Sequence, residues 1–342
     1  MNLFSGSLSI ITFRRKAKLR RLACLLAITV GSPAGAEEVR LSLPLDCVVG
    51  QSCAIQHYVD RQEGSGSKDY RCGTMTYNDH NGTDFRLPSL SIMRQGVDVR
   101  AAAGGRVLRM RDGSPDVSVR DIDRKTVKGV ECGNGLVIEH SDGYETQYCH
   151  LAKDSIRVRP GQKVQAGDTL AKVGLSGDTE FPHLHFTVRK NGHVIDPFAP
   201  SKGEGESCGS GTAIWAPEVA AGLSYVGGQV LNSGFAAGTL TMEDIAEGSI
   251  AKPVRGSAAL VAYVLAIGLR AGDVQHLALT GPEGKIIAEQ MAKPLARNKA
   301  QQMLFVGRKR RGSEWAAGTY YATYKVARGG ETVILKSFET IF

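Results

Sequence analysis

The 342-residue sequence is organised around one stretch, Phe181-Pro182-His183-Leu184-His185-Phe186-Thr187-Val188. Aromatic and β-branched residues dominate it and a proline stands near its start, which predicts a β-strand. Alternate residues of a strand face opposite sides, so His183 and His185 share one face while Leu184 and Phe186 point into a core. Two neighbouring imidazoles can bind a metal together, or one can bind while the other transfers protons.

Short strand-like segments punctuated by glycine surround this stretch. The pattern predicts strands at 97–99, 105–108, 135–140 and 144–148, and a hairpin turn at Ser141-Asp142-Gly143. Residues 112–130 are polar and charged, and we expect them to form an exposed insertion. With 41 glycines and only 6% aromatic residues, the composition favours a mainly β fold.

Composition changes divide the rest of the chain. Residues 37–77 hold two strand candidates, 39–43 and 53–60, and are predicted to pack on a domain at 78–201. The glycine- and serine-rich residues 202–211 are typical of a linker. Residues 212–342 alternate strand and turn patterns, including an apolar run at 259–269, and predict a smaller C-terminal β-sandwich domain.

Residues 1–36 have the pattern of a secretory signal peptide. A basic block at 14–21 precedes the apolar run 22–30, and Ala34-Gly35-Ala36 provides a cleavage site after Ala36. The apolar run is shorter than the ~20 residues that cross a bilayer, so we expect export without a stable membrane anchor. The leader holds 6 of the 42 basic residues and no acidic residue, which leaves 36 basic against 34 acidic residues. A net charge of +2 in the remainder (36 minus 34) gives no support for nucleic-acid binding.

The six cysteines after the leader predict disulfide bonds, because exported proteins fold in oxidising compartments. Cys47 and Cys53 flank a glycine-containing turn, and Cys132 and Cys149 flank the predicted hairpin. The two remaining cysteines, Cys72 and Cys208, would then pair with each other. The alternative is that the cysteines bind zinc as thiolates. The sequence contains no C-x-x-C pair, which argues against this alternative.

A second stretch, His80-Asn81-Gly82-Thr83-Asp84, can join the paired histidines. It supplies an imidazole and a carboxylate around a glycine that permits a tight backbone path. Together with one histidine of the 183/185 pair, these donors make two imidazoles and one carboxylate, with a fourth position left for water. That arrangement is typical of a catalytic zinc site, in which the bound water is acidic enough to act as a nucleophile.

A third stretch, 144–151, ends its strand with His150. Hydrolysis of an amide also needs groups that accept the proton of the water and stabilise the oxyanion, and His150 with the remaining histidine could supply them. The other four histidines are expected to be structural: His57, His140, His193 and His276.

These motifs in this order resemble the lysostaphin-type (LytM-like) zinc peptidases, which are peptidoglycan endopeptidases. The resemblance spans about 76–198 and also includes the stretches 133–140, 148–151, 160–168 and 192–198. It implies a β-rich duplicated hybrid motif with Zn²⁺ bound by His80, Asp84 and His185. It also implies that His150 and His183 are catalytic, and that the zinc-bound water attacks the peptide.

Some features of the chain depart from a minimal member of that family. Residues 85–96 and 112–130 are longer, and we expect them to border the substrate groove. A tyrosine that some relatives use near the metal has three candidates here, Tyr70, Tyr77 and Tyr148.

The sequence therefore predicts a periplasmic zinc metalloendopeptidase that hydrolyses peptide cross-links of peptidoglycan. Export with disulfides favours D-alanyl–diaminopimelate bonds over glycine bridges. The alternative is a non-catalytic wall-binding regulator that activates another peptidoglycan hydrolase, but such relatives typically lack metal ligands. The peptide stems are the expected partner, and the C-terminal domain is a candidate surface for a regulatory partner.

Overall fold

The largest sheet of the computed structural model contains the His183–His185 stretch. The structure describes residues 7, 9–10, 12, 39–201, 208–209 and 211–342. Within them the sheet has eight strands in the order β1-β2-β9-β6-β5-β4-β7, with β10 paired to β9. Neighbouring strands are antiparallel. The bounds are β1 (Ala54–His57), β2 (Thr83–Arg86), β4 (Gly105–Arg111), β5 (Asn134–Glu139), β6 (Tyr144–Leu151), β7 (Lys163–Val164), β9 (His183–Lys190) and β10 (His193–Ile195).

Smaller elements complete this part of the chain. β3 (Asp98–Arg100) pairs with β8 (Thr169–Lys172) in a separate two-stranded sheet. Helix α1 (Leu90–Gln95) and the 3-10 helices η1 (Arg124–Val127) and η2 (Ser141–Gly143) lie in connections. Alternate residues of the central strands are buried in one core, which includes Leu184 and Phe186 of β9 and Tyr148 of β6. The opposite face of those strands is left to carry the histidines.

Three disulfides are present among the described residues. They join Cys47 to Cys53, Cys72 to Cys208, and Cys132 to Cys149. All three predicted pairings are therefore confirmed, and the thiolate alternative is not. The Cys132–Cys149 bond attaches the end of the connection 112–133 to β6, next to His150.

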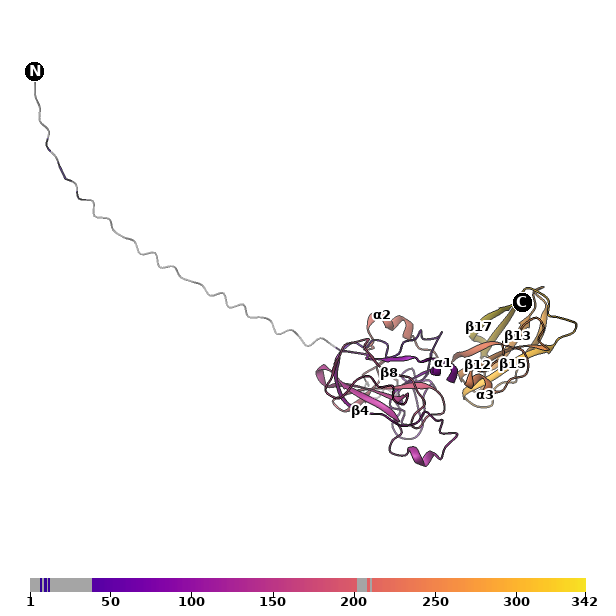
Figure 1. Cartoon of the computed structure of the whole chain (residues 1–342), viewed down its shortest axis with the longest axis horizontal. Helices are drawn as coiled ribbons and strands as arrows, with labels where there is room; N and C mark the ends of the chain where they lie inside the picture. The colour runs from indigo at the N-terminus through magenta and orange to yellow at the C-terminus, as the bar shows by residue number, and fades with distance from the viewer. Residues whose placement is uncertain (1–6, 8, 11, 13–38, 202–207, 210) are drawn as a thin grey trace, which may run out of the picture. The chain divides into compact units, whose positions relative to one another are not determined.

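Residues 212–342 contribute two sheets, drawn in orange and yellow in Figure 1. One has the order β11-β12-β15 and the other β14-β13-β16-β17. Three short helices also lie in this part of the chain. The bounds are α2 (Pro217–Ala220), η3 (Ala221–Leu223), β11 (Gln229–Ala236), α3 (Met242–Glu247), β12 (Ala259–Leu269), β13 (Val274–Thr280), β14 (Ile286–Met291), β15 (Lys299–Lys309), β16 (Thr319–Arg328) and β17 (Glu331–Ile341).

Strand β12 explains the apolar run at 259–269. Leu260, Ala262 and Val264 face a core shared with Leu277 and Tyr324 of the other sheet. Alternate residues on the other face belong to a second cluster that includes Ile245 of α3. Because both faces of the strand are buried, its sequence is continuously apolar and does not alternate between apolar and polar residues.

The mainly β fold class predicted from the sequence is confirmed. The hairpin at 141–143 joins β5 to β6 as expected, and residues 112–130 contain no strand. The strand predicted at 39–43 is wrong, because Leu41 makes only an isolated bridge to Trp215. The leader at 1–36 and most of the linker at 202–211 lie outside the described residues, and the domain boundaries stay predictions. No helix among the described residues is long and apolar enough to cross a membrane.

Candidate metal centre

The pairing of β2 with β9 brings two separate stretches of the sequence together. Asp84 lies directly opposite His185 in the register of these antiparallel strands, so their side chains share a face. His80 precedes β2 by one tight turn. Gly82 in that turn has no room for a side chain, since an added Cβ would lie 2.6 Å from Nε2 of His185. The glycine thus permits the close approach that the sequence led us to expect.

Three donor atoms converge at this point. His80 Nε2 lies 3.1 Å from Asp84 Oδ1 and 3.2 Å from His185 Nδ1. His185 Nδ1 lies 2.9 Å from the same carboxylate oxygen. Such a cluster could hold a metal ion.

The outer nitrogens of both histidines have hydrogen-bond partners of their own. His80 Nδ1 donates to the backbone carbonyl of Tyr58 at 2.7 Å. His185 Nε2 lies 2.9 Å from Oδ1 of Asn81 and donates to it. Each bond leaves the inner nitrogen with a free lone pair and fixes the orientation of the ring, as is usual for metal-binding histidines. Two imidazoles and one carboxylate suit Zn²⁺ and leave a fourth position open.

Burial and charge act in opposite directions on the pKa values of these ligands. For Asp84, burial raises the pKa, but His80, His183, His185 and His57 outweigh it and hold the pKa well below its usual range. For His80, burial lowers the pKa, but the neighbouring Asp84 carboxylate raises it overall. Burial lowers the pKa of His185. The carboxylate is therefore ionised at neutral pH, as a metal ligand must be.

His150 and His183 lie beside the three donors. Their ring centroids are 4.6 Å apart, and His183 Nε2 lies 3.5 Å from Asp84 Oδ1. His150 Nδ1 donates to the carbonyl of Ser176 at 2.8 Å, and His183 Nδ1 donates to that of Phe181 at 3.0 Å. Both rings therefore direct Nε2 away from the backbone, as the chemistry of a proton acceptor requires.

An unusual backbone conformation places His150. A regular strand would direct residue 150 to the same face as Tyr148, which is in the core. The φ angle of His150 is +60°, a left-handed conformation that is uncommon for residues other than glycine. Hydrogen bonds from His150 N to Cys132 O and from Gly174 N to His150 O, both 2.9 Å, hold it there. The strained residue is thus fixed by its neighbours, one of which is a disulfide cysteine.

Burial also keeps both of these histidines neutral. It lowers the pKa of His183 to about 4 and that of His150 well below the usual value, with further lowering of the latter by His183 and His185. Neutral imidazoles can accept a proton at physiological pH.

His57 reaches the same centre, so the structural role predicted for it from the sequence is incomplete. It lies on β1, and its Nδ1 is 3.0 Å from Asp84 Oδ2, the oxygen that faces away from His80 and His185. The two carboxylate oxygens thus have different partners. By donating to Oδ2, His57 orients Oδ1 toward Nε2 of His80 and Nδ1 of His185. No motif in the sequence links residue 57 to residue 84, so only the pairing of β1 with β2 could reveal it.

We expect the replacement His57→Ala to weaken zinc binding about 10- to 100-fold, which is the usual cost of losing a partner that orients a metal ligand. Competition with a chelating dye would measure the dissociation constant. His140→Ala is the matched control, because this buried histidine bonds to Gly104 and Thr146 away from the centre. An unchanged zinc affinity in His57→Ala would contradict the orienting role.

The remaining candidates lie in different places. Tyr77 stacks beside His80 with ring centroids 4.5 Å apart and lines the cavity next to the donors. Tyr70 and Tyr148 are buried in the core. His193 is exposed, and His276 lies 3.3 Å from Glu289 in another sheet. Of the three candidate tyrosines, only Tyr77 is therefore placed to meet a substrate.

The longer segments 85–96 and 112–130 do not line this cavity. Its lining in the described chain comes instead from residues 77, 79–81, 131–132, 147, 149–150, 178, 185, 187 and 189. Residues of both segments meet in a second cavity of about 570 Å³, which Met93 and Asp116 line. The expectation that they border the groove is not met at the cavity beside the donors, but Gly129 and Val130 of the second segment line the cavity that adjoins it.

Part of the chain is similar to known proteins. Residues 78–197 match the model of peptidase family M23. The peptidoglycan DD-endopeptidase ShyB of Vibrio cholerae is 36% identical over 117 residues, which are 34% of this chain and 22% of ShyB. The DD-carboxypeptidase/endopeptidase Mpg of Neisseria meningitidis is 32% identical over 36% of this chain and 23% of Mpg.

A solved structure, that of a zinc-containing peptidase from Vibrio cholerae, is 30% identical over 42% of this chain and 38% of its own, with a TM-score of 0.27. The chain thus spans less than a quarter of the length of the curated relatives it matches. The residues matched by the family model include His80, Asp84, His150, His183 and His185. The family match is therefore to peptidase family M23 and covers residues 78–197.

Proposed function

We propose that this chain is an exported zinc endopeptidase that hydrolyses peptide cross-links of peptidoglycan. The observation that carries the proposal is the convergence of His80, Asp84 and His185 within hydrogen-bond distance, with two further imidazoles beside them. A regulator that only binds the wall has no need for such a set. The endopeptidase names of the relatives support the same substrate class.

The five residues have two proposed roles, as metal ligands and as catalytic residues. His80, Asp84 and His185 would hold the zinc ion, which supplies Lewis acidity when bound and so makes a water molecule nucleophilic near neutral pH. His150 and His183 direct Nε2 toward the same space and are neutral, so one accepts the proton of the attacking water. The proton taken up at that Nε2 can then pass to the leaving amine, and the other imidazole accepts a hydrogen bond from the same water at its own Nε2 and so positions it.

The expected location follows from two features of the chain. The leader pattern at 1–36 predicts export, and three disulfides suit an oxidising compartment. We therefore propose that the chain acts in the periplasm and that its substrate is the D-alanyl–diaminopimelate cross-link.

Digestion of purified cross-linked muropeptides by the zinc-loaded protein would test this proposal. Mass spectrometry should show conversion of dimers to monomers by the wild type and none by His150→Ala. Intact dimers in the wild-type digest, under conditions where a known endopeptidase cuts them, would refute it. If the inactive wild type also failed to retain zinc after loading, a non-catalytic regulator would be the better explanation.

A further inference from the structure

The face of the sheet that carries the metal centre continues beyond it across four strands. Thr187 of β9 lies opposite Gln147 of β6, Gln147 opposite Val137 of β5, and Val137 opposite Arg109 of β4. Residues directly opposite one another share a face, so Arg109 belongs to the same surface as His185. Arg189 stands two residues after Thr187 on that face.

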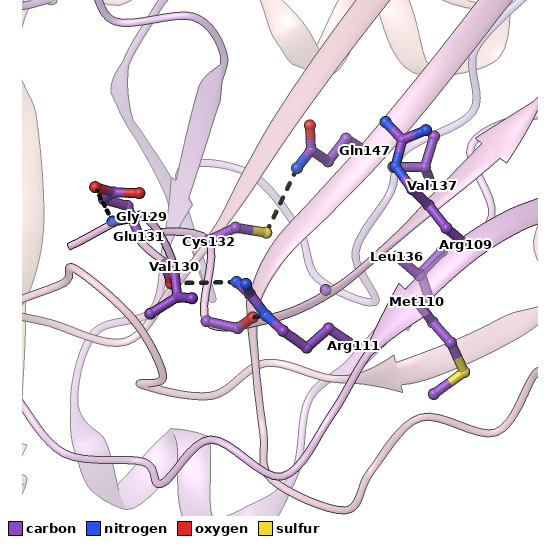
Figure 2. Close-up of a pocket in the computed structure, with 12 residues that line it drawn as sticks. Arg109, Met110, Arg111, Gly129, Val130, Glu131, Cys132, Leu136, Val137 and Gln147 are labelled. Atoms are coloured by element: carbon purple, nitrogen blue, oxygen red, sulfur yellow. Dashed lines mark hydrogen bonds between the residues drawn. The ribbon is translucent and has the colours of Figure 1, made fainter. Parts of the chain in front are cut away.

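Two cavities occupy this surface and share walls. One of them is the cavity that adjoins the metal centre, and Arg189 lines it. The other is a separate cavity lined by Arg109, drawn in Figure 2. Each has a volume of about 280 Å³. Glu131, Cys132 and Gln147 line both cavities. A peptide lying with its scissile bond at His185 could therefore extend over Gln147 toward the two arginines.

The arginines of this surface differ in what they bind. Arg111 donates to the carbonyl of Gly133 and to that of Val130, the latter labelled in Figure 2, and so holds the connection in place. Arg109 is exposed and makes no ion pair with any described residue. Arg189 is half-buried, and its Nη1 is shielded from solvent with no hydrogen-bond partner in the described part of the chain. A shielded donor without a partner is costly, which favours a ligand that completes it.

One acidic neighbour lies near Arg189 without pairing with it. Glu145 lies opposite Arg189 in the register, yet it forms no ion pair with it within the described residues. Glu131 accepts a hydrogen bond from the backbone of Gly129 at 2.7 Å. Burial lowers the pKa of Arg189, Glu145 raises it, and Arg109 lowers it by less than Glu145 raises it. Glu145 thus partly offsets the charge of Arg189, and an anion that reached both guanidinium groups would be stabilised by each.

We propose that Arg109 and Arg189 form a subsite for a free carboxylate of the peptide substrate, an inference that rests on the proposed function. Arg189 follows His185 by four residues on the strand, about 13 Å along its axis. The side chains can span part of that distance, so the carboxylate belongs to a residue one or two positions from the scissile bond. Cross-linked diaminopimelate stems keep free carboxylates near that bond, whereas a glycine bridge has none.

A pair of matched substrates tests the subsite. One is a cross-linked muropeptide with a free carboxylate on the residue that supplies the scissile nitrogen, and the other carries a carboxamide at that position. For the wild type, kcat/KM should be about 10- to 100-fold higher on the carboxylate, as expected for a hydrogen-bonded charge pair. Most of the difference should appear in KM.

The variants Arg189→Gln and Arg109→Gln should lower kcat/KM on the carboxylate and leave the carboxamide nearly unchanged. Arg159→Gln is the matched control, because Arg159 is exposed in the connection between β6 and β7. Arg109 is exposed as well, so its variant should fold even if that of Arg189 does not. Calorimetric binding of both peptides to inactive His150→Ala protein gives a second measure of the same preference.

The two proposals fail differently. Equal cleavage of both substrates by the wild type, or equal losses on both in the Arg109→Gln variant, would overturn the subsite and leave the proposed function standing. Failure of the zinc-loaded wild type to cleave either substrate would overturn the proposed function and the subsite with it.

Discussion

The replacements His150→Ala and His183→Ala are expected to abolish peptide hydrolysis and to leave zinc bound. Neither imidazole belongs to the trio of donors, and each is anchored through Nδ1 to a backbone carbonyl. Loss of a positioned acid or base costs about 10²–10⁴-fold in rate. Steady-state kcat on a cross-linked muropeptide, together with metal analysis of the same samples, would measure both effects.

His193→Ala serves as the control, since that histidine is exposed at the start of β10. It should match the wild type in rate and zinc content. If His150→Ala lost its zinc, then His150 would be a metal ligand, and the proposed assignment of ligands and catalytic residues would be wrong. If either variant kept more than a tenth of the wild-type kcat, that residue would not take part in the proton transfers.

Local sequence patterns were enough to predict the elements around the metal centre. The alternation of β9 gives the shared face of His183 and His185, because side chains of a strand alternate whatever its partners are. The glycine of the 80–84 stretch indicates a tight turn, and an added Cβ would indeed lie against the His185 ring. The continuous apolar run at 259–269 corresponds to β12 with the same bounds.

Other features depend on pairings that the sequence does not reveal. His57 reaches Asp84 only because β1 lies beside β2, and the bond between them joins residues 27 positions apart. His150 departs from strand alternation through a left-handed φ, which the hydrogen bond to Cys132 stabilises. Arg109 and Arg189 lie on one face through the registers of four strands. Each of these features depends on residues far apart in the sequence, so no local pattern could predict it.

The replacement His185→Ala is expected to remove the zinc ion itself. It leaves only His80 and Asp84 of the three converging donors, and structural and catalytic zinc sites both use at least three protein ligands. Zinc should therefore no longer stabilise the folded state. For the wild type, free zinc at 100 times the dissociation constant adds about 2.7 kcal/mol to the free energy of unfolding.

Thermal denaturation with and without zinc would show this loss, and His183→Ala is the best control. The two histidines lie two residues apart on the same face of β9 and are both largely buried, so their replacements remove similar packing. They differ in their distance from the carboxylate. Nδ1 of His185 lies 2.9 Å from Asp84 Oδ1, whereas Nε2 of His183 lies 3.5 Å from the same atom. A zinc-dependent rise in Tm that persists in His183→Ala and disappears in His185→Ala would assign the ligand by this difference. The same rise in both variants would mean that neither histidine is essential for holding the metal.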